Sequence, residues 1–286
     1  MPDNRSPVDG ARVLSDLNAL RAIGAYKTGV HKPTFSEPHL RSLEWLAQRL
    51  AEAGLSAEID GIGNVLGTSA KPGAKLLAGS HLESQNYAGW LDGPLGVVYA
   101  LEAARVLNPD PAVNGAVEVA SWCDEEGHFG HFLGSRSYVG TVTEADIDAA
   151  HDRSSGKSMR EALRDSGLAG RVRATCERGR HIGYLEAHIE QGETLESSRL
   201  AIGIVTSIGS HSPASKTTPA PRGWRSARMP ASRSPGSAST SMTASRRYQG
   251  RARSGPPAAS PSIPARRASS PAPRRCCFRF AMTTLP

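Results

Sequence analysis

The chain is organised around the segment Gly79-Ser80-His81-Leu82-Glu83-Ser84-Gln85-Asn86-Tyr87-Ala88-Gly89-Trp90-Leu91-Asp92-Gly93. The apolar run Lys75 to Ser80 predicts a buried strand that carries His81 at its C-terminal end, and Leu95 to Leu107 predicts a helix. An imidazole at a strand end and a carboxylate at a loop end can meet beyond the carboxyl edge of an α/β sheet, where such sheets bind ligands. These groups suit zinc or manganese. The alternative is a polar loop whose hydrogen bonds are satisfied.

Two further segments repeat this pattern of apolar residues followed by polar ones. Ala116 to Trp122 predicts a strand that ends in Cys123-Asp124-Glu125-Glu126-Gly127. Leu185-Glu186-Ala187-His188-Ile189-Glu190-Gln191-Gly192 carries a second histidine. Adjacent carboxylates repel each other unless a positive charge lies beside them. A pair of metal ions would meet this need, with one carboxylate bound to an ion and its neighbour free as a base.

The order of these motifs resembles a known family. The motifs are His81-Leu82-Glu83, Asp92-Gly93, Asp124-Glu125-Glu126-Gly127, Leu133-Gly134-Ser135-Arg136 and His188-Ile189-Glu190-Gln191-Gly192. Together they resemble the hydantoinase/carbamoylase-type amidases, which include N-carbamoyl-L-amino-acid hydrolase, allantoate amidohydrolase and β-ureidopropionase. That family belongs to the dinuclear metallopeptidase superfamily related to carboxypeptidase G2. The resemblance covers residues 1–208. One departure is visible, because the family usually has His-x-Asp where this chain has Glu83.

The resemblance implies a two-metal hydrolase, with zinc or manganese as the ions. It makes His81 and His188 ligands of the first ion, Asp92 the bridge and Glu126 a ligand of the second ion. It makes Glu125 the general base that takes a proton from the attacking water. Glu83 would orient His81 through its carboxylate, and Gln191 would contact the substrate. Taken one at a time, these residues are more often solvated loop acids or a core histidine.

The family site also needs a histidine from near its C-terminus and a second domain that forms the homodimer interface. We expect this chain to lack both, to hold at most one ion tightly and to be inactive as written. The expected partner is a small carbamoyl or ureido compound such as an N-carbamoyl amino acid or allantoate. A dipeptidase or carboxypeptidase relative is the second hypothesis; His188 disfavours it, because those enzymes usually have an acid there.

The net charge of +7 does not indicate a nucleic-acid-binding protein. Of the 34 lysines and arginines, 14 lie from Gly209 onward, where there is no acidic residue. Residues 1–208 therefore hold 20 basic and all 27 acidic residues, a net charge of −7. No apolar run is long enough to span a membrane, and Met1 to Gly10 carry no hydrophobic signal. We therefore expect a cytoplasmic enzyme without nucleic-acid or membrane partners; a binding protein that uses the basic tail is the third hypothesis.

Strand and helix patterns alternate along residues 1–208. They predict an α/β fold: an incomplete zinc-peptidase-like catalytic domain with helices on both faces of a mixed sheet. Helices are expected over 11–23, 36–53, 95–107, 131–139, 144–151 and 158–168, and strands over 56–59, 64–68, 75–80, 116–122, 182–190 and 200–208.

The pattern breaks after Ile208. Serine, alanine, proline and arginine dominate residues 209–286 without periodicity, which predicts a disordered basic tail. The codons that could encode residues 216–231, read one base earlier, are compatible with Asn-His-Ala-Gly-Thr-Thr, which resembles the start of the family's second domain. We therefore interpret the tail as the product of a frameshift near Ile208, natural or from sequencing.

Overall fold

Three parallel strands form the centre of the sheet. In the computed structural model, which describes residues 8–205 and 278–283, β6 (Gly115–Trp122) and β7 (His181–Ile189) flank β5 (Ala74–His81) and run parallel to it. All eight residues of β6 are buried, as expected of a strand with apolar layers on both faces. The carboxyl ends of the three strands therefore meet at one edge of the sheet.

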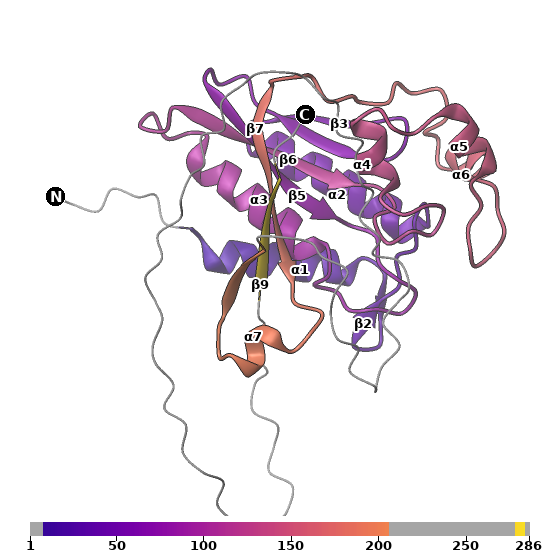
Figure 1. Ribbon diagram of the computed structural model, residues 1–286, viewed down its shortest axis with the longest axis horizontal. Helices are drawn as coiled ribbons and strands as arrows, with labels where there is room; N and C mark the ends of the chain where they lie inside the picture. The colour runs from indigo at the N-terminus through magenta and orange to yellow at the C-terminus, as the bar shows by residue number, and fades with distance from the viewer. Residues whose placement is uncertain (1–7, 206–277, 284–286) are drawn as a thin grey trace, which may run out of the picture. The chain divides into compact units, whose positions relative to one another are not determined.

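The flanking strands make the sheet mixed, and its order is β3-β4-β6-β5-β7-β9-β8 (Figure 1). On one side, β3 (Ser56–Ile59) and β4 (Val65–Thr68) form an antiparallel hairpin that joins β6. On the other side, β9 (Phe278–Thr283) pairs antiparallel with β7 and parallel with β8 (Ile202–Val205). A separate two-stranded sheet consists of β1 (Ala25–Tyr26) and β2 (Gly29–Val30).

Three helices cover one face of the sheet. They are α1 (Gly10–Ala22), α2 (Glu37–Glu52) and α3 (Pro94–Leu107), and their leucines and valines form the main core with Val65, Ala78 and Val119. The sequence begins α2 as predicted, because the Ser36 side chain accepts the amide proton of His39 and Pro38 lies in the first turn.

The opposite face carries α4 (Leu133–Tyr138), whose Tyr138 packs with Leu66, Leu77 and Trp122. Leu77 and Ala78 are consecutive in β5 and belong to different clusters, because alternate strand residues point to opposite faces. Beyond α4, α5 (Glu144–Ala149) and α6 (Met159–Asp165) each begin with a capping box and share a third cluster around Ile62. A short α7 (Thr194–Ser197) precedes β8.

These layers confirm the predicted α/β fold, a mixed sheet with helices on both faces. The elements β1, β2 and α7 were not predicted, because two to four residues are too few to show a period. Strand β9 lies within the segment expected to be a disordered tail; Phe278 and Phe280 are of the aromatic type that favours strands. The rest of that segment, 209–277 and 284–286, lies outside the described residues.

No helix in the described part of the chain is both long and apolar enough to cross a membrane.

Candidate metal centre

Two strand ends and one loop bring together His81, Asp92 and His188. His81 is the last residue of β5, His188 lies one residue before the end of β7, and Asp92 lies in the loop before α3. The loop can approach β5 because Gly93 has φ +84° and no side chain; a Cβ there would lie 2.6 Å from Nδ1 of His81. The sequence therefore predicted this convergence correctly.

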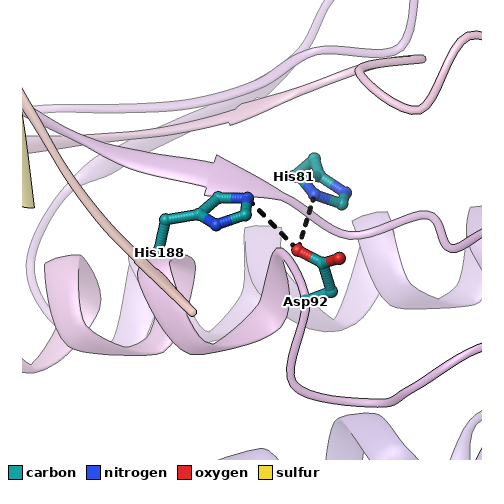
Figure 2. A group of neighbouring side chains, drawn as sticks. All are labelled: His81, Asp92 and His188. Atoms are coloured by element: carbon teal, nitrogen blue, oxygen red, sulfur yellow. Dashed lines mark ion pairs between the residues drawn. The ribbon is translucent and has the colours of Figure 1, made fainter. Parts of the chain in front are cut away.

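The three side chains offer one shared point for a cation. Figure 2 shows both rings directed at the same carboxylate oxygen: Oδ1 of Asp92 lies 3.2 Å from Nε2 of His188 and 3.9 Å from Nε2 of His81. The ligand atoms of the three residues all lie within 4.8 Å of one another. His81 is fully buried, whereas Asp92 and His188 are partly exposed, so the group is open to solvent on one side.

The hydrogen bonds of the two rings leave the correct nitrogens free for a cation. Nδ1 of His81 lies 3.0 Å from the carbonyl oxygen of Glu83, and Nδ1 of His188 lies 2.7 Å from that of Ile189. A carbonyl oxygen only accepts, so in the neutral form of each ring the proton is on Nδ1, and the lone pair of Nε2 is left for a cation that displaces any second proton. Nε2 of His81 and Oδ1 of Asp92 are buried and have no hydrogen-bond partner. Two imidazoles and a carboxylate fit one divalent ion.

The local electrostatics also favour a positive charge at this point. Burial alone lowers the pKa of His81, but the carboxylates of Glu83, Glu125 and Asp92 outweigh it and raise the pKa to about 9. The same negative field would stabilise a bound cation.

Glu125 lies beside the three ligands, with Oε2 3.6 Å from Nε2 of His81. Burial raises the pKa of Glu125 to about 7, because His81 offsets only part of the effect and the carboxylates of Glu83 and Glu186 add to it. A carboxyl group that titrates near neutral pH can both take and give a proton, as a general base must. The geometry therefore suits the role predicted for Glu125.

Glu126 does not join this group. Its carboxylate accepts a hydrogen bond from Nε2 of Gln85 at 2.5 Å, and its carbonyl oxygen accepts from the same nitrogen at 2.9 Å. Gln191, predicted as a substrate contact, donates instead to Oδ2 of Asp92 at 2.6 Å. Among the described residues, one group of three side chains could hold an ion, and Oε2 of Glu126 and Oδ2 of Asp92 each accept a hydrogen bond from a glutamine instead.

Glu83 contacts His81 as predicted, but through its main-chain carbonyl group and not through its carboxylate. The carbonyl oxygen of Glu83, not its carboxylate, contacts Nδ1 of His81; the nearer carboxylate oxygen lies 3.7 Å from that nitrogen. That oxygen, Oε1, instead accepts the amide protons of Glu125 at 2.6 Å and Glu126 at 3.3 Å.

Sequence reasoning missed a hydrogen-bonded chain beneath the site. Nε1 of Trp122 donates to the hydroxyl of Tyr184, which donates to Glu186, and Ser80 donates to the same carboxylate at 2.6 Å. The chain links β6, β7 and β5, the strands whose ends form the site. One signal could have revealed Glu186: it lies two residues before His188, which places both side chains on one face of β7.

Comparisons with known proteins agree with this geometry. The chain is 35% identical over 211 residues to an N-carbamoyl-L-amino acid amidohydrolase of Geobacillus stearothermophilus, a match that covers 70% of this chain and 51% of that protein. It is 34% identical to an allantoate amidohydrolase of Bacillus subtilis, with 59% and 44% covered. A crystal structure of a hydantoinase/carbamoylase family amidase from Burkholderia phymatum superposes with a TM-score of 0.65 at 47% identity, with 68% and 48% covered.

The chain spans about half the length of the curated relatives it matches. The profile of peptidase family M20/M25/M40 matches residues 74–272, the range that contains His81, Asp92, Glu125 and His188. The predicted resemblance to hydantoinase/carbamoylase-type amidases is thereby confirmed, and the chain belongs to peptidase family M20/M25/M40.

Proposed function

We propose that this chain is the metal-binding part of an amidohydrolase that cleaves a non-peptide C–N bond in an N-carbamoyl amino acid or a ureido compound such as allantoate. The convergence of His81, Asp92 and His188 carries the proposal. The relatives named N-carbamoyl-L-amino acid amidohydrolase and allantoate amidohydrolase support the substrate class.

In this proposal, His81, Asp92 and His188 hold one divalent ion, zinc or manganese. When bound, such an ion polarises the carbonyl group of the substrate as a Lewis acid. Glu125 takes a proton from the attacking water and delivers it to the leaving nitrogen. A positioned carboxylate of this kind typically contributes about 10²–10⁴-fold in rate. Glu126 would have to release Gln85 before it could reach an ion.

The test is equilibrium titration of the metal-free 286-residue chain with Co²⁺, Zn²⁺ and Mn²⁺, followed by assays of the frame-restored protein with N-carbamoyl amino acids and allantoate. We expect one tightly bound ion per chain. Failure to bind any of the three ions would contradict the proposed site. Hydrolysis of a dipeptide in preference to both substrate classes would contradict the proposed reaction.

The domain organisation stays a prediction. We propose that residues 1–208 are the N-terminal part of the catalytic domain and that residues 209–286 replace, by a frameshift, the second domain and the C-terminal catalytic segment. The match to about half of each relative is compatible with this interpretation. Resequencing the gene tests it, because an uninterrupted reading frame for residues 209–286 would end the frameshift hypothesis.

A further inference from the structure

The turn that carries Glu125 is held by side chains on two sides. Its first residue, Asp124, has a left-handed backbone with φ 58°, a conformation that needs support from neighbours. The Asp124 carboxylate accepts the amide protons of residues 128, 129 and 130, and it also accepts from Thr34. The amides of Glu125 and Glu126 point the other way, and both donate to Oε1 of Glu83.

A buried neutral histidine faces the other oxygen of Glu83. Nε2 of His39 lies 3.7 Å from Oε2 of Glu83, and both side chains are fully buried. Nδ1 of His39 accepts the amide proton of Phe35 at 3.0 Å, so the proton of the neutral ring is on Nε2 and faces the carboxylate. Burial lowers the pKa of His39 to about 3, which keeps the ring neutral.

A buried lysine, Lys32, lies close enough to Glu83 to feel its charge. Lys32 is only 1% exposed. Burial lowers the pKa of Lys32 to about 8, and the nearby carboxylate of Glu83 opposes this effect. A carboxylate buried this deeply needs hydrogen bonds or nearby positive charge, and the two backbone amides that donate to Oε1 supply the hydrogen bonds of Glu83.

We infer that the side chain of Glu83 is a positioning residue for the general base Glu125, and that His81 is oriented by the main-chain carbonyl of Glu83. The longer side chain of Glu83 reaches the backbone amides of residues 125 and 126. These hydrogen bonds fix the main chain of Glu125, and with it the position of its Cβ, relative to His81. The inference rests on the proposed function only for the role of Glu125 as the base. The hydrogen bonds that it assigns join Glu83 to the main chain of residues 125 and 126 and involve none of the three proposed metal ligands.

The experiment measures amide hydrogen exchange at residues 125 and 126 in the metal-free chain, together with the affinity for Co²⁺. The variant is Glu83→Asp, which retracts the carboxylate by roughly 1.5 Å, one carbon–carbon bond. The matched control is Glu102→Asp, since Glu102 is also buried (2% exposed) and accepts a backbone amide proton, from Asp9. In Glu83→Asp we expect both amides to exchange at least tenfold faster, with the Co²⁺ dissociation constant changed less than threefold. In the control we expect neither readout to change beyond threefold at these positions.

Unchanged exchange at both amides in Glu83→Asp would overturn the inference. A loss of Co²⁺ affinity of about 10–100-fold would also overturn it, since that is the typical cost of removing a side chain that orients a metal ligand. If Glu83→Asp fails to fold, Glu83→Gln replaces it, because glutamine keeps the side-chain length and removes the charge. We then expect the amides of residues 125 and 126 to exchange at least threefold faster, and an unchanged exchange rate would again overturn the inference. If the unsubstituted chain binds no Co²⁺, the proposed function fails, whereas the exchange experiment still decides the role of Glu83.

Discussion

Replacement of Asp92 by asparagine should remove most of the affinity of the chain for a divalent ion. Oδ1 of Asp92 faces both histidines, at 3.2 Å from Nε2 of His188 and 3.9 Å from Nε2 of His81. The asparagine oxygen can still accept the hydrogen bond from Gln191, so the loop should keep its conformation. The substitution therefore removes one negative charge from the site with little change in shape.

The expected loss is at least about 100-fold in the dissociation constant. Removal of a residue that only supports a ligand typically costs about 10–100-fold, and Asp92 is proposed as a direct ligand, so its loss should cost at least as much as the upper value. A factor of 100 corresponds to about 2.7 kcal/mol of binding free energy. Titration calorimetry with Zn²⁺ and the visible absorption of bound Co²⁺ measure this change, and circular dichroism shows whether the variant is folded.

Glu126→Gln is the matched variant for this experiment. The carboxylate of Glu126 is held by Gln85 and lies outside the group of three ligands, so its neutralisation should change the dissociation constant less than threefold. Equal effects of the two substitutions would refute our reasoning. A larger effect of Glu126→Gln would make Glu126, and not Asp92, the main carboxylate ligand.

Three further results are expected. Gly93→Ala should weaken Co²⁺ binding at least tenfold and lower the thermal midpoint, because the new Cβ would lie 2.6 Å from the ring of His81 at a residue with φ +84°; calorimetric titration and a melting curve measure both. Leu101→Ala should lower the free energy of unfolding by about 3–5 kcal/mol in urea, since Leu101 is fully buried in the main core, and a loss below 1 kcal/mol would contradict that packing. Burial alone raises the pKa of Glu118, but hydrogen bonds from His181 and Arg180 outweigh this effect and lower the pKa from 4.5 to about 2. The lowered pKa contributes roughly 3 kcal/mol to the free energy of unfolding above pH 4.5, and this contribution is lost as the pH falls toward 2. Urea unfolding across that range should show a loss that is absent in Glu118→Gln.

The sequence alone determined the longer helices, most strands of the main sheet and the strand ends that carry the candidate site. Apolar runs followed by His81, Glu125 and His188 indicate parallel strands that end at one edge, because period and polarity are local properties of the chain. Ser36, Pro38 and their neighbours likewise fixed the start of α2 within one residue. The same local signals could not reveal β9, because its strand partners are distant in sequence.

Only the tertiary structure decided which atom of each residue acts at the site. The sequence shows that Glu83 follows His81 closely, but it cannot show that the carbonyl oxygen contacts the ring while the carboxylate reaches the amides of Glu125 and Glu126. It also cannot show that Gln85 holds Glu126 away from the three ligands. The physical reason is that a side chain with several rotatable bonds selects its partner by the distances and burial that long-range packing creates, and residue spacing does not encode these distances.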